Sequence, residues 1–263
     1  MFARELKVNL KSFVIWTGIL LILFLIVFLM YPSLIASENM DQVDELLKVF
    51  PPEVLKAFNM DIAAIDTAFG WMKTEGFVFV LLITGVYSSI LGTGILLKEE
   101  SDKTIEYLNS LPVTRRQIVL AKVAAATFYI FSMILILGIF NYAVLRINED
   151  VDKKQFVLLS ITPLFSSLVI FALCLFISTF THKTKKVFGI GLGVVFAAYF
   201  INVISEMSGK VKFLRFFSIF TLADVRNVIT EERIRPVMIG VTGILFILLC
   251  ILANWHYEKK ELV

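Results

Sequence analysis

The sequence predicts an all-α integral membrane protein that forms a single transmembrane domain over residues 1–263. Its composition is 58% hydrophobic and only 18% charged, which is far from that of a soluble domain. Stretches of about 18 or more residues without a charged side chain are typical of membrane-spanning helices, because a helix satisfies its own backbone polar groups where water is absent. Six such stretches predict spans at about 13–30, 77–97, 123–145, 156–180, 187–205 and 237–255.

The charges predict both the energy source and the topology. None of the six spans contains Asp, Glu, Lys, Arg or His, so no intramembrane ion relay is expected, and the energy for any transport must come from elsewhere. With the N-terminus inside, the cytoplasmic pieces hold 13 Lys and Arg in 51 residues and the outside pieces 12 in 86. This density predicts cytoplasmic N- and C-termini, although the exterior segment 206–235 departs from the pattern.

The first span follows a basic, partly amphipathic start without a break. Its apolar run is longer than that of a secretion signal and no cleavage site follows, which favours an uncleaved span. Residues 31–76 then carry eight Asp or Glu against three Lys, with apolar residues at helical spacing, and predict a small extracellular cap of short helices. These carboxylates have neither calcium-loop spacing nor a nearby His, so no metal site is expected.

Polar side chains at helical spacing in the second span, and one in the third, are candidates for lining a substrate pathway. Hydrogen bonding between helices is the alternative for each of them. The candidates are Thr84, Tyr87, Ser88 and Asn141. In the fifth span Gly189, Gly191 and Gly193 are interpreted as packing glycines, because no strand or Lys-Ser/Thr pair makes them a phosphate loop.

Residues 98–122 form a polar interruption that predicts a helix, an elbow and a second helix. Thr104, Tyr107, Leu108 and Leu111 share one helix face, and Pro112 ends that helix. Thr114 to Gln117 has the form of a capping box, which predicts that the next helix begins there and continues into the third span.

The spacing E-E-x-x-K-T-x-E-x-L-x-x-L-P-x-x-R, followed by Lys122, resembles the cytoplasmic signature of the permease subunits of type-2 ABC exporters, with Lys103 where that family usually has Gly. In such permeases this elbow is a coupling helix that docks on a separate ATP-binding subunit. The resemblance implies a docking interface made by Glu99, Glu100, Lys103, Thr104, Glu106, Tyr107, Leu108, Leu111, Pro112 and Arg115.

Two further segments match the same family by position. Residues 206–235 contain an aromatic patch too short to cross a bilayer, which predicts a re-entrant or interfacial piece. In the family a re-entrant hairpin here gates the outer side, so Phe213, Phe216, Phe217 and Phe220 are candidate gate residues. Residues 5–16 resemble the helix that lies along the inner surface in these permeases; simple flanking positive charge is the alternative.

The resemblance implies a permease subunit of an ATP-driven exporter in the bacterial plasma membrane, acting as a homodimer. The expected substrate is amphipathic or hydrophobic, with peptides or antimicrobial peptides favoured. ATP and Mg²⁺ are expected in the ATP-binding partner. This chain is expected to contain neither a cofactor nor a catalytic site. Nucleic acid is not an expected partner, because the segment that interleaves basic and aromatic residues, 206–235, is expected at the exterior membrane surface.

Two other classes stay open. A non-transporting membrane scaffold or sensor would use the cap to bind a ligand and the elbow to signal inward. An intramembrane metalloprotease would use the Glu99-Glu100 pair, but it needs histidines on neighbouring helices, and His182 and His256 both lie at the cytoplasmic ends of spans.

Overall fold

The computed structural model describes residues 1–34, 49, 51, 67–101, 113–148, 150–182, 184–207, 209–225, 228 and 231–260. Every regular element within these residues is helical, and six segments are long and apolar enough to cross a membrane. These segments are Phe2–Tyr31, Ala68–Gly94, Arg115–Ile147, Lys153–Ser178, Lys186–Met207 and Pro236–Lys259. The predicted all-α fold with six spans is therefore confirmed.

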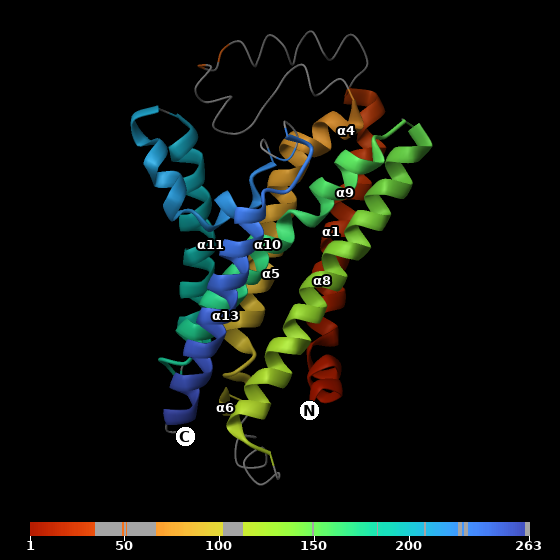
Figure 1. Cartoon of the computed structure of the whole chain (residues 1–263). Coiled ribbons are helices and arrows are strands. Elements are labelled where there is room, and N and C mark those ends of the chain that lie inside the picture. Colours follow the sequence, from red (N-terminus) through yellow and green to blue (C-terminus); the bar gives the residue numbers. More distant parts are fainter. Residues whose placement is uncertain are drawn as a thin grey trace.

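The helices form one bundle in which α1 begins and α13 ends at the same end (Figure 1). We call this the terminus end, and the opposite one the far end. The elements are α1 (Phe2–Leu34), α4 (Ala68–Trp71), the π-helical turn η2 (Met72–Gly76), α5 (Phe77–Gly94), α6 (Lys98–Ser101), α8 (Arg115–Asn148), α9 (Lys153–Ile161), α10 (Pro163–Ser178), α11 (Thr184–Met207), the 3₁₀ helices η3 (Gly209–Phe217) and η4 (Ile219–Ala223), and α13 (Pro236–Lys259).

Helices α5 and α10 make the most extensive contact in the bundle, with α11 and α13 on one side and α1 and α8 on the other (Figure 1). Gly92 on α5 lies at their crossing, because a Cβ there would be 2.5 Å from the carbonyl oxygen of Phe171. Small residues at such points let helix backbones approach closely within a membrane. The centre of the bundle therefore depends on this glycine.

The glycines of α11 are not equivalent. A Cβ on Gly191 would be 2.6 Å from Ser89 Oγ on α5, whereas Gly189 and Gly193 have nothing within 4 Å of theirs. Residues two apart on a helix point to nearly opposite sides, so only alternate members of the run can face a neighbour. Gly191 therefore packs against α5, whereas no described residue of this chain packs against Gly189 or Gly193.

The sequence predicts a separate surface helix before the first span, but α1 is one helix over 33 residues, about 50 Å at 1.5 Å per residue. A bilayer core is about 30 Å thick, so one helix both crosses it and extends beyond it. Tyr129 Oη donates to the backbone oxygen of Leu6, and Glu5 is 1% exposed. The start of α1 therefore packs against α8.

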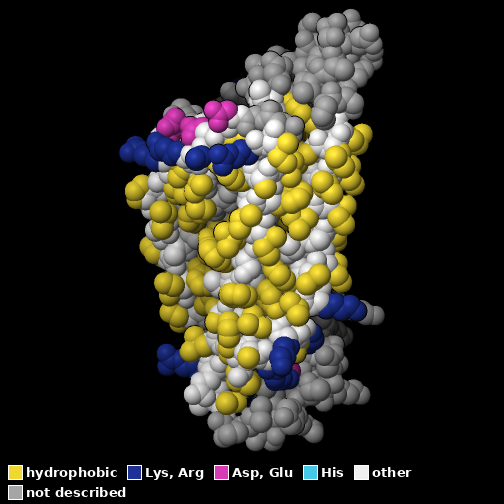
Figure 2. All heavy atoms as spheres, turned by 90° about the vertical axis from the view of Figure 1, so that its right-hand side faces the viewer, with side chains coloured by type: hydrophobic (Ala, Val, Ile, Leu, Met, Phe, Trp, Pro, Cys, Tyr) yellow, Lys and Arg dark blue, Asp and Glu magenta, His cyan; other side chains and the backbone are white. Residues whose placement is uncertain are grey.

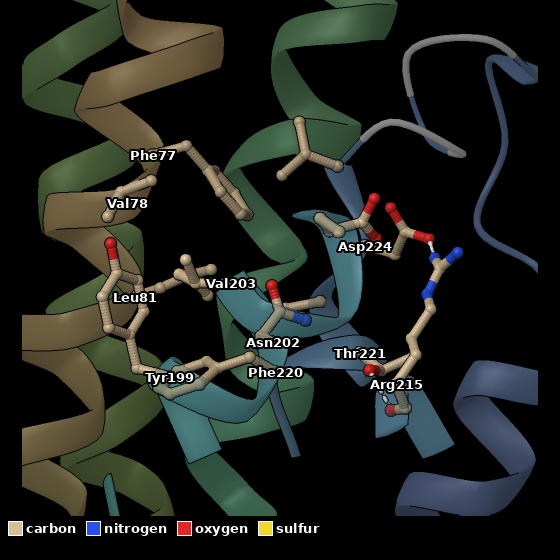
Figure 3. Close-up of a pocket in the computed structure, with 13 residues that line it drawn as sticks. Phe77, Val78, Leu81, Tyr199, Asn202, Val203, Arg215, Phe220, Thr221 and Asp224 are labelled. Carbon is tan, nitrogen blue, oxygen red and sulfur yellow. Dashed lines mark hydrogen bonds and ion pairs between the residues drawn. The ribbon is translucent and has the colours of Figure 1, made fainter. Parts of the chain in front are cut away.

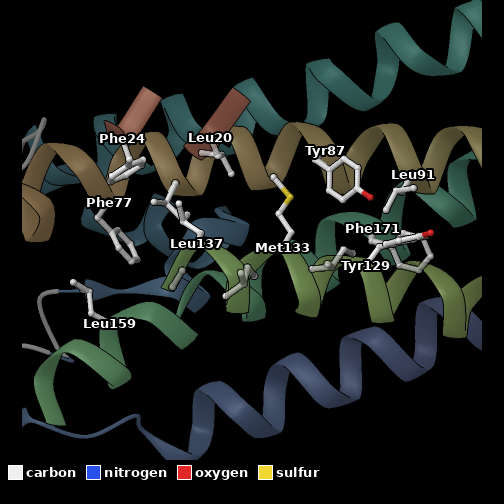
Figure 4. Close-up of a cluster of buried hydrophobic side chains, with 14 of the residues drawn as sticks. Leu20, Phe24, Phe77, Tyr87, Leu91, Tyr129, Met133, Leu137, Leu159 and Phe171 are labelled. Atoms are coloured by element: carbon white, nitrogen blue, oxygen red, sulfur yellow. The ribbon is translucent and has the colours of Figure 1, made fainter. Parts of the chain in front are cut away.

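The hydrophobic core joins α1, α5 and α8 (Figure 4). Leu20 and Phe24 of α1, Tyr87 of α5 and Met133 of α8 are all almost completely buried. Outside this core the surface stays hydrophobic. Figure 2 shows a hydrophobic band between two levels of charged side chains, as expected for a protein surrounded by lipid.

The predicted cap, 31–76, lies largely outside the described residues. Its last part is helical: Thr67 Oγ1 accepts a hydrogen bond from Gly70 N (2.9 Å) and caps α4. A π-helical turn then leads into α5, with Gly76 beneath the Trp71 ring, where a Cβ would be 2.9 Å from a ring carbon. The second span thus starts about two turns earlier than its charge-free stretch.

Between α11 and α13 the chain turns back into the bundle as η3 and η4. Ser218 Oγ donates to the carbonyl oxygen of Ala198 (2.7 Å), which lies nine residues before the end of α11, about 14 Å along its axis. The segment contacts α10, α11 and α13. It consists of two short 3₁₀ helices, and its re-entrant role stays a prediction.

Candidate functional site

The most highly charged buried part of the described chain lies at the terminus end, where α6 follows α5. Glu99 and Glu100 are 4% and 9% exposed. Consecutive residues on a helix point in different directions. Each carboxylate therefore has its own partners, and together they hold the start of the elbow to four other parts of the chain.

Glu99 faces α8 and α1. Lys122 Nζ donates to both carboxylate oxygens of Glu99 (2.7 and 2.9 Å), to Glu5 Oε2 (3.2 Å) and to the backbone oxygen of Ile95 (2.6 Å). Lys122 is 1% exposed, so its charge is removed from water and neutralised by these oxygens. A guanidinium nitrogen of Arg4 lies 3.9 Å from Glu99.

Glu100 faces the other side of the bundle. Lys260 Nζ, just after α13, donates to its two oxygens (2.9 and 3.2 Å) and to the backbone oxygen of Thr181 (2.8 Å). His182 Nδ1 lies 2.8 Å from the same carboxylate. Glu100 therefore ties α6 to the α10–α11 connection and to the end of the last span.

Arg115, the first residue of α8, also reaches this end of α13. Its Nη1 lies within hydrogen-bond distance of the backbone oxygens of Tyr257 (3.3 Å), Glu258 (3.0 Å) and Lys260 (2.8 Å). The last carbonyls of a helix have no partner within it and carry partial negative charge, so a cation is stabilised there.

The return from the elbow into α8 occurs at the predicted capping box. Gln117 N donates to Thr114 Oγ1 (3.2 Å), and Thr114 N donates to Gln117 Oε1 (3.0 Å). Both hydrogen bonds of the box are present, so this prediction is confirmed. Both ends of the elbow are thus held, at Glu99-Glu100 and at Thr114–Gln117.

We call Glu5, Glu99, Glu100, Arg115, Lys122, His182 and Lys260 the elbow joint. The sequence predicts three of these as site residues, Glu99, Glu100 and Arg115, and the structure brings them together. The other predicted docking residues, Lys103, Thr104, Glu106, Tyr107, Leu108, Leu111 and Pro112, lie outside the described residues. Docking of Glu99 and Glu100 on another subunit stays a prediction, and in this chain both carboxylates already have partners.

The joint connects helices through its charged side chains. Its carboxylates face lysines, and no three His, Cys, Asp or Glu side chains in the described parts of the chain form a metal-binding group. Removing one partner of a buried ion pair leaves an unpaired charge and costs about 3–5 kcal/mol. These ion pairs therefore resist separation of α6 from α1, α8 and the end of α13.

The four candidate pathway residues are all buried but do not share one hollow. Thr84 Oγ1 donates within its own helix to the backbone oxygen of Val80 (2.7 Å). Tyr87 Oη and Ser88 Oγ have no hydrogen-bond partner among the described residues. Asn141 lines a small cavity of about 20 Å³ that contains none of the other three. Their role in a pathway stays a prediction.

The four candidate gate residues divide into two groups. Phe220 is buried in η4 and lines a hollow of about 80 Å³ together with Phe77 and Tyr199 (Figure 3). The other three are exposed and line a groove of about 990 Å³ between the 3₁₀ helices and α13; they are Phe213, Phe216 and Phe217. An ion pair between Arg215 and Asp224 borders both spaces.

We expect Ser218→Ala to loosen this far-end segment. Ser218 Oγ accepts from Phe220 N (3.2 Å) as well as donating to Ala198, so the change removes the cap of η4 and its link to α11. The loss is about 1–2 kcal/mol, seen as a lower midpoint of thermal denaturation in detergent. Ser205→Ala is the control, because its hydroxyl bonds only within α11. Equal shifts for both variants would contradict the assignment.

The Arg235 guanidinium, hydrogen-bonded to Glu231 (2.9 Å), holds the pKa of that carboxyl below its ordinary value, with Arg233 contributing. Because this pKa is lowered in the folded state, the contact stabilises the fold at pH values above the ordinary glutamate pKa. Its contribution to stability is lost as the pH falls through the lowered pKa. Both side chains are at the protein surface, so the contribution is small.

Six apolar helices that together form one bundle, with a charged joint where the second and third spans meet, define a multi-pass membrane protein. The family model for ABC-2 family transporter proteins matches residues 1–262, so this chain belongs to that family. It is accordingly the permease of an ABC transporter, and the family implies an ATP-binding partner subunit that carries ATP and Mg²⁺. Comparisons with curated proteins and with solved structures give no match.

Proposed function

We propose that this permease exports an amphipathic or hydrophobic substrate, driven by a separate ATP-binding subunit that docks on the elbow 98–122. The observation that supports this most directly is the elbow joint. Both ends of the elbow are fixed to spanning helices by buried ion pairs and backbone hydrogen bonds. A force on the described ends of the elbow therefore reaches α1, α8 and α13 through these contacts.

The absence of charge from the cores of the spans supports the substrate class. A route between such helices suits molecules that tolerate apolar and aromatic surroundings, and small ions would need polar ligands there. Amphipathic peptides, including antimicrobial peptides, have both an apolar face and a size that matches an aromatic-lined groove. Two copies of the chain form the pathway, in the bacterial plasma membrane, with both termini in the cytoplasm.

The test is transport by vesicles that contain the permease and its ATP-binding subunit with their cytoplasmic faces outward. A fluorescent amphipathic peptide is expected to accumulate inside when ATP and Mg²⁺ are added, and not when ATP is replaced by a non-hydrolysable analogue. Binding of the peptide to empty vesicles is the control. Accumulation that is independent of ATP, or absent for a panel of amphipathic peptides and lipid-like molecules, would contradict the proposal.

A further inference from the structure

An apolar groove of about 550 Å³ lies between α8 and α9, in the half of the bundle nearest the far end. One wall is the Phe131, Leu135 and Ile139 stripe of α8, and the other is Val157 and Ile161 of α9. All five side chains are 41–62% exposed. Within a hydrophobic band such a groove is open to the hydrocarbon of the bilayer rather than to water (Figure 2).

A glycine creates the groove. Gly138 lies on its floor, where a Cβ would meet the Cβ of Ser160 on α9 at 3.5 Å, an ordinary contact distance. The two helices therefore meet closely at this point, and no side chain from Gly138 fills the space above it. A hydrocarbon chain can lie in that space without moving either helix.

The rim of the groove at the far end is basic. Lys153, at the first turn of α9, lines the groove and has no ion-pair partner among the described residues. Arg146 lies over the ring of Tyr142, which also lines the groove, with its guanidinium carbon 6.0 Å from the ring centroid.

Acidic groups lie close in sequence to these two cations, among them Asp150 and Asp152. Lys154 Nζ pairs with Glu232 (2.9 Å), and the Asp152 carboxylate accepts from the backbone N of Lys154 (2.9 Å), which caps α9. Glu232 is therefore paired with Lys154, whereas Asp152 caps the helix and keeps its charge. Lys153 is the charged side chain that lines the groove itself, and an apolar trough with a cation at its membrane-surface end suits an anionic amphiphile.

We propose that this groove binds one acyl chain of an anionic lipid from the leaflet at the far end, with the phosphate against Lys153 and Arg146. The volume lies in the range of small-molecule sites, and its almost wholly apolar lining suits a saturated chain. The site needs neither the ATP-binding subunit nor transport, so it is independent of the proposed function.

The test uses the full chain in phosphatidylcholine vesicles that contain a small fraction of phosphatidylglycerol with a photoactivatable group in one acyl chain. After illumination, labelled peptides are expected from residues 131–143 and 153–164. Lys153→Gln is expected to reduce this labelling about fivefold, the contribution of one lysine near an anionic membrane surface. Lys154→Gln is the matched control, because Lys154 is already paired with Glu232. This variant is expected to change the labelling less than twofold.

A second pair of variants tests the groove itself. Gly138→Leu fills its floor and is expected to abolish labelling there, while Gly240→Leu on α13, which has open space around it, leaves labelling unchanged. If Gly138→Leu does not fold, Val157→Trp narrows the groove from its exposed wall with the same expected result. Equal labelling by a phosphatidylcholine probe, or labelling insensitive to these variants, would overturn the proposal. Crosslinks between two copies at Val157 would assign the groove to a second copy and also overturn it.

Discussion

Lys122→Met is expected to destabilise the folded chain by about 3–5 kcal/mol. The lysine neutralises both Glu5 and Glu99 in an environment where its own side chain is 1% exposed. Methionine fills similar space but removes the cation that pairs with Glu5 and leaves Glu99 with only Arg4, whose guanidinium lies 3.9 Å away. The expected readout is a fall on the order of 10 °C in the midpoint of thermal denaturation in detergent.

Two further variants separate the lost ion pair from lost packing. The triple variant Glu5→Gln, Lys122→Met, Glu99→Gln removes all three charges, and it is expected to recover much of the stability, because no unpaired charge stays buried. Lys7→Met, at an exposed position of α1, is expected to change the free energy of unfolding by less than about 0.5 kcal/mol. A Lys122→Met protein as stable as Lys7→Met would show that the joint is not a stabilising contact.

Gly92→Leu is expected to prevent correct folding, and Gly92→Ala to cost about 1–3 kcal/mol despite the better helix propensity of alanine. A Cβ at this position would be 2.5 Å from the Phe171 carbonyl oxygen and 2.8 Å from Cys174 Cβ. A backbone atom cannot rotate away as a side chain can. Helices α5 and α10 would therefore have to separate at the centre of the bundle.

Gly94 supplies the matched control, because it lies two residues further along the same helix with nothing within 4 Å of its Cβ position. Gly94→Ala and Gly94→Leu are expected to yield a monodisperse protein in detergent with an unchanged thermal midpoint. Equal yields and midpoints for the Gly92 and Gly94 series would contradict the close approach of α5 to α10.

The fold was predictable because its main signals are local. Each span is a charge-free run long enough to cross a bilayer, and the start of α8 depends on Thr114 and Gln117, three residues apart. The resemblance suggested a surface helix before the first span, with flanking positive charge as the alternative, and the structure has one continuous helix from Phe2 to Leu34. Helix propensity continues without interruption from Phe2, and the polar start of α1 packs on α8 through Glu5.

The joint was only partly predictable, because its partners are far apart in sequence. Lys260 meets Glu100 across 160 residues, and Lys122 meets Glu5 across 117. The resemblance placed Glu99 and Glu100 at a docking interface with another subunit, and no local pattern indicated their partners within the chain. The lone acidic Glu5 in a basic N-terminus was the one sequence signal that pointed to a buried pair.

In the proposed mechanism, the joint and the elbow link the spanning helices to ATP hydrolysis in the partner subunit. Because α6 is held to α1 and α8 through Lys122, and to the end of α13 through Lys260, displacement of the elbow moves three spans together. We expect the ATP-binding subunit to contact the elbow between these two fixed ends.

The most direct measurement is co-purification of the chain with its ATP-binding subunit in detergent, followed by ATP turnover of the complex, for wild type and Leu108→Asp. Phe2→Asp, an equivalent change at an exposed position of the terminus end outside the elbow, is the control. We expect wild type and Phe2→Asp to give the same complex and turnover, and Leu108→Asp to lose the subunit or to change its turnover. A Leu108→Asp permease that binds the subunit and supports turnover as wild type does would contradict coupling through the elbow.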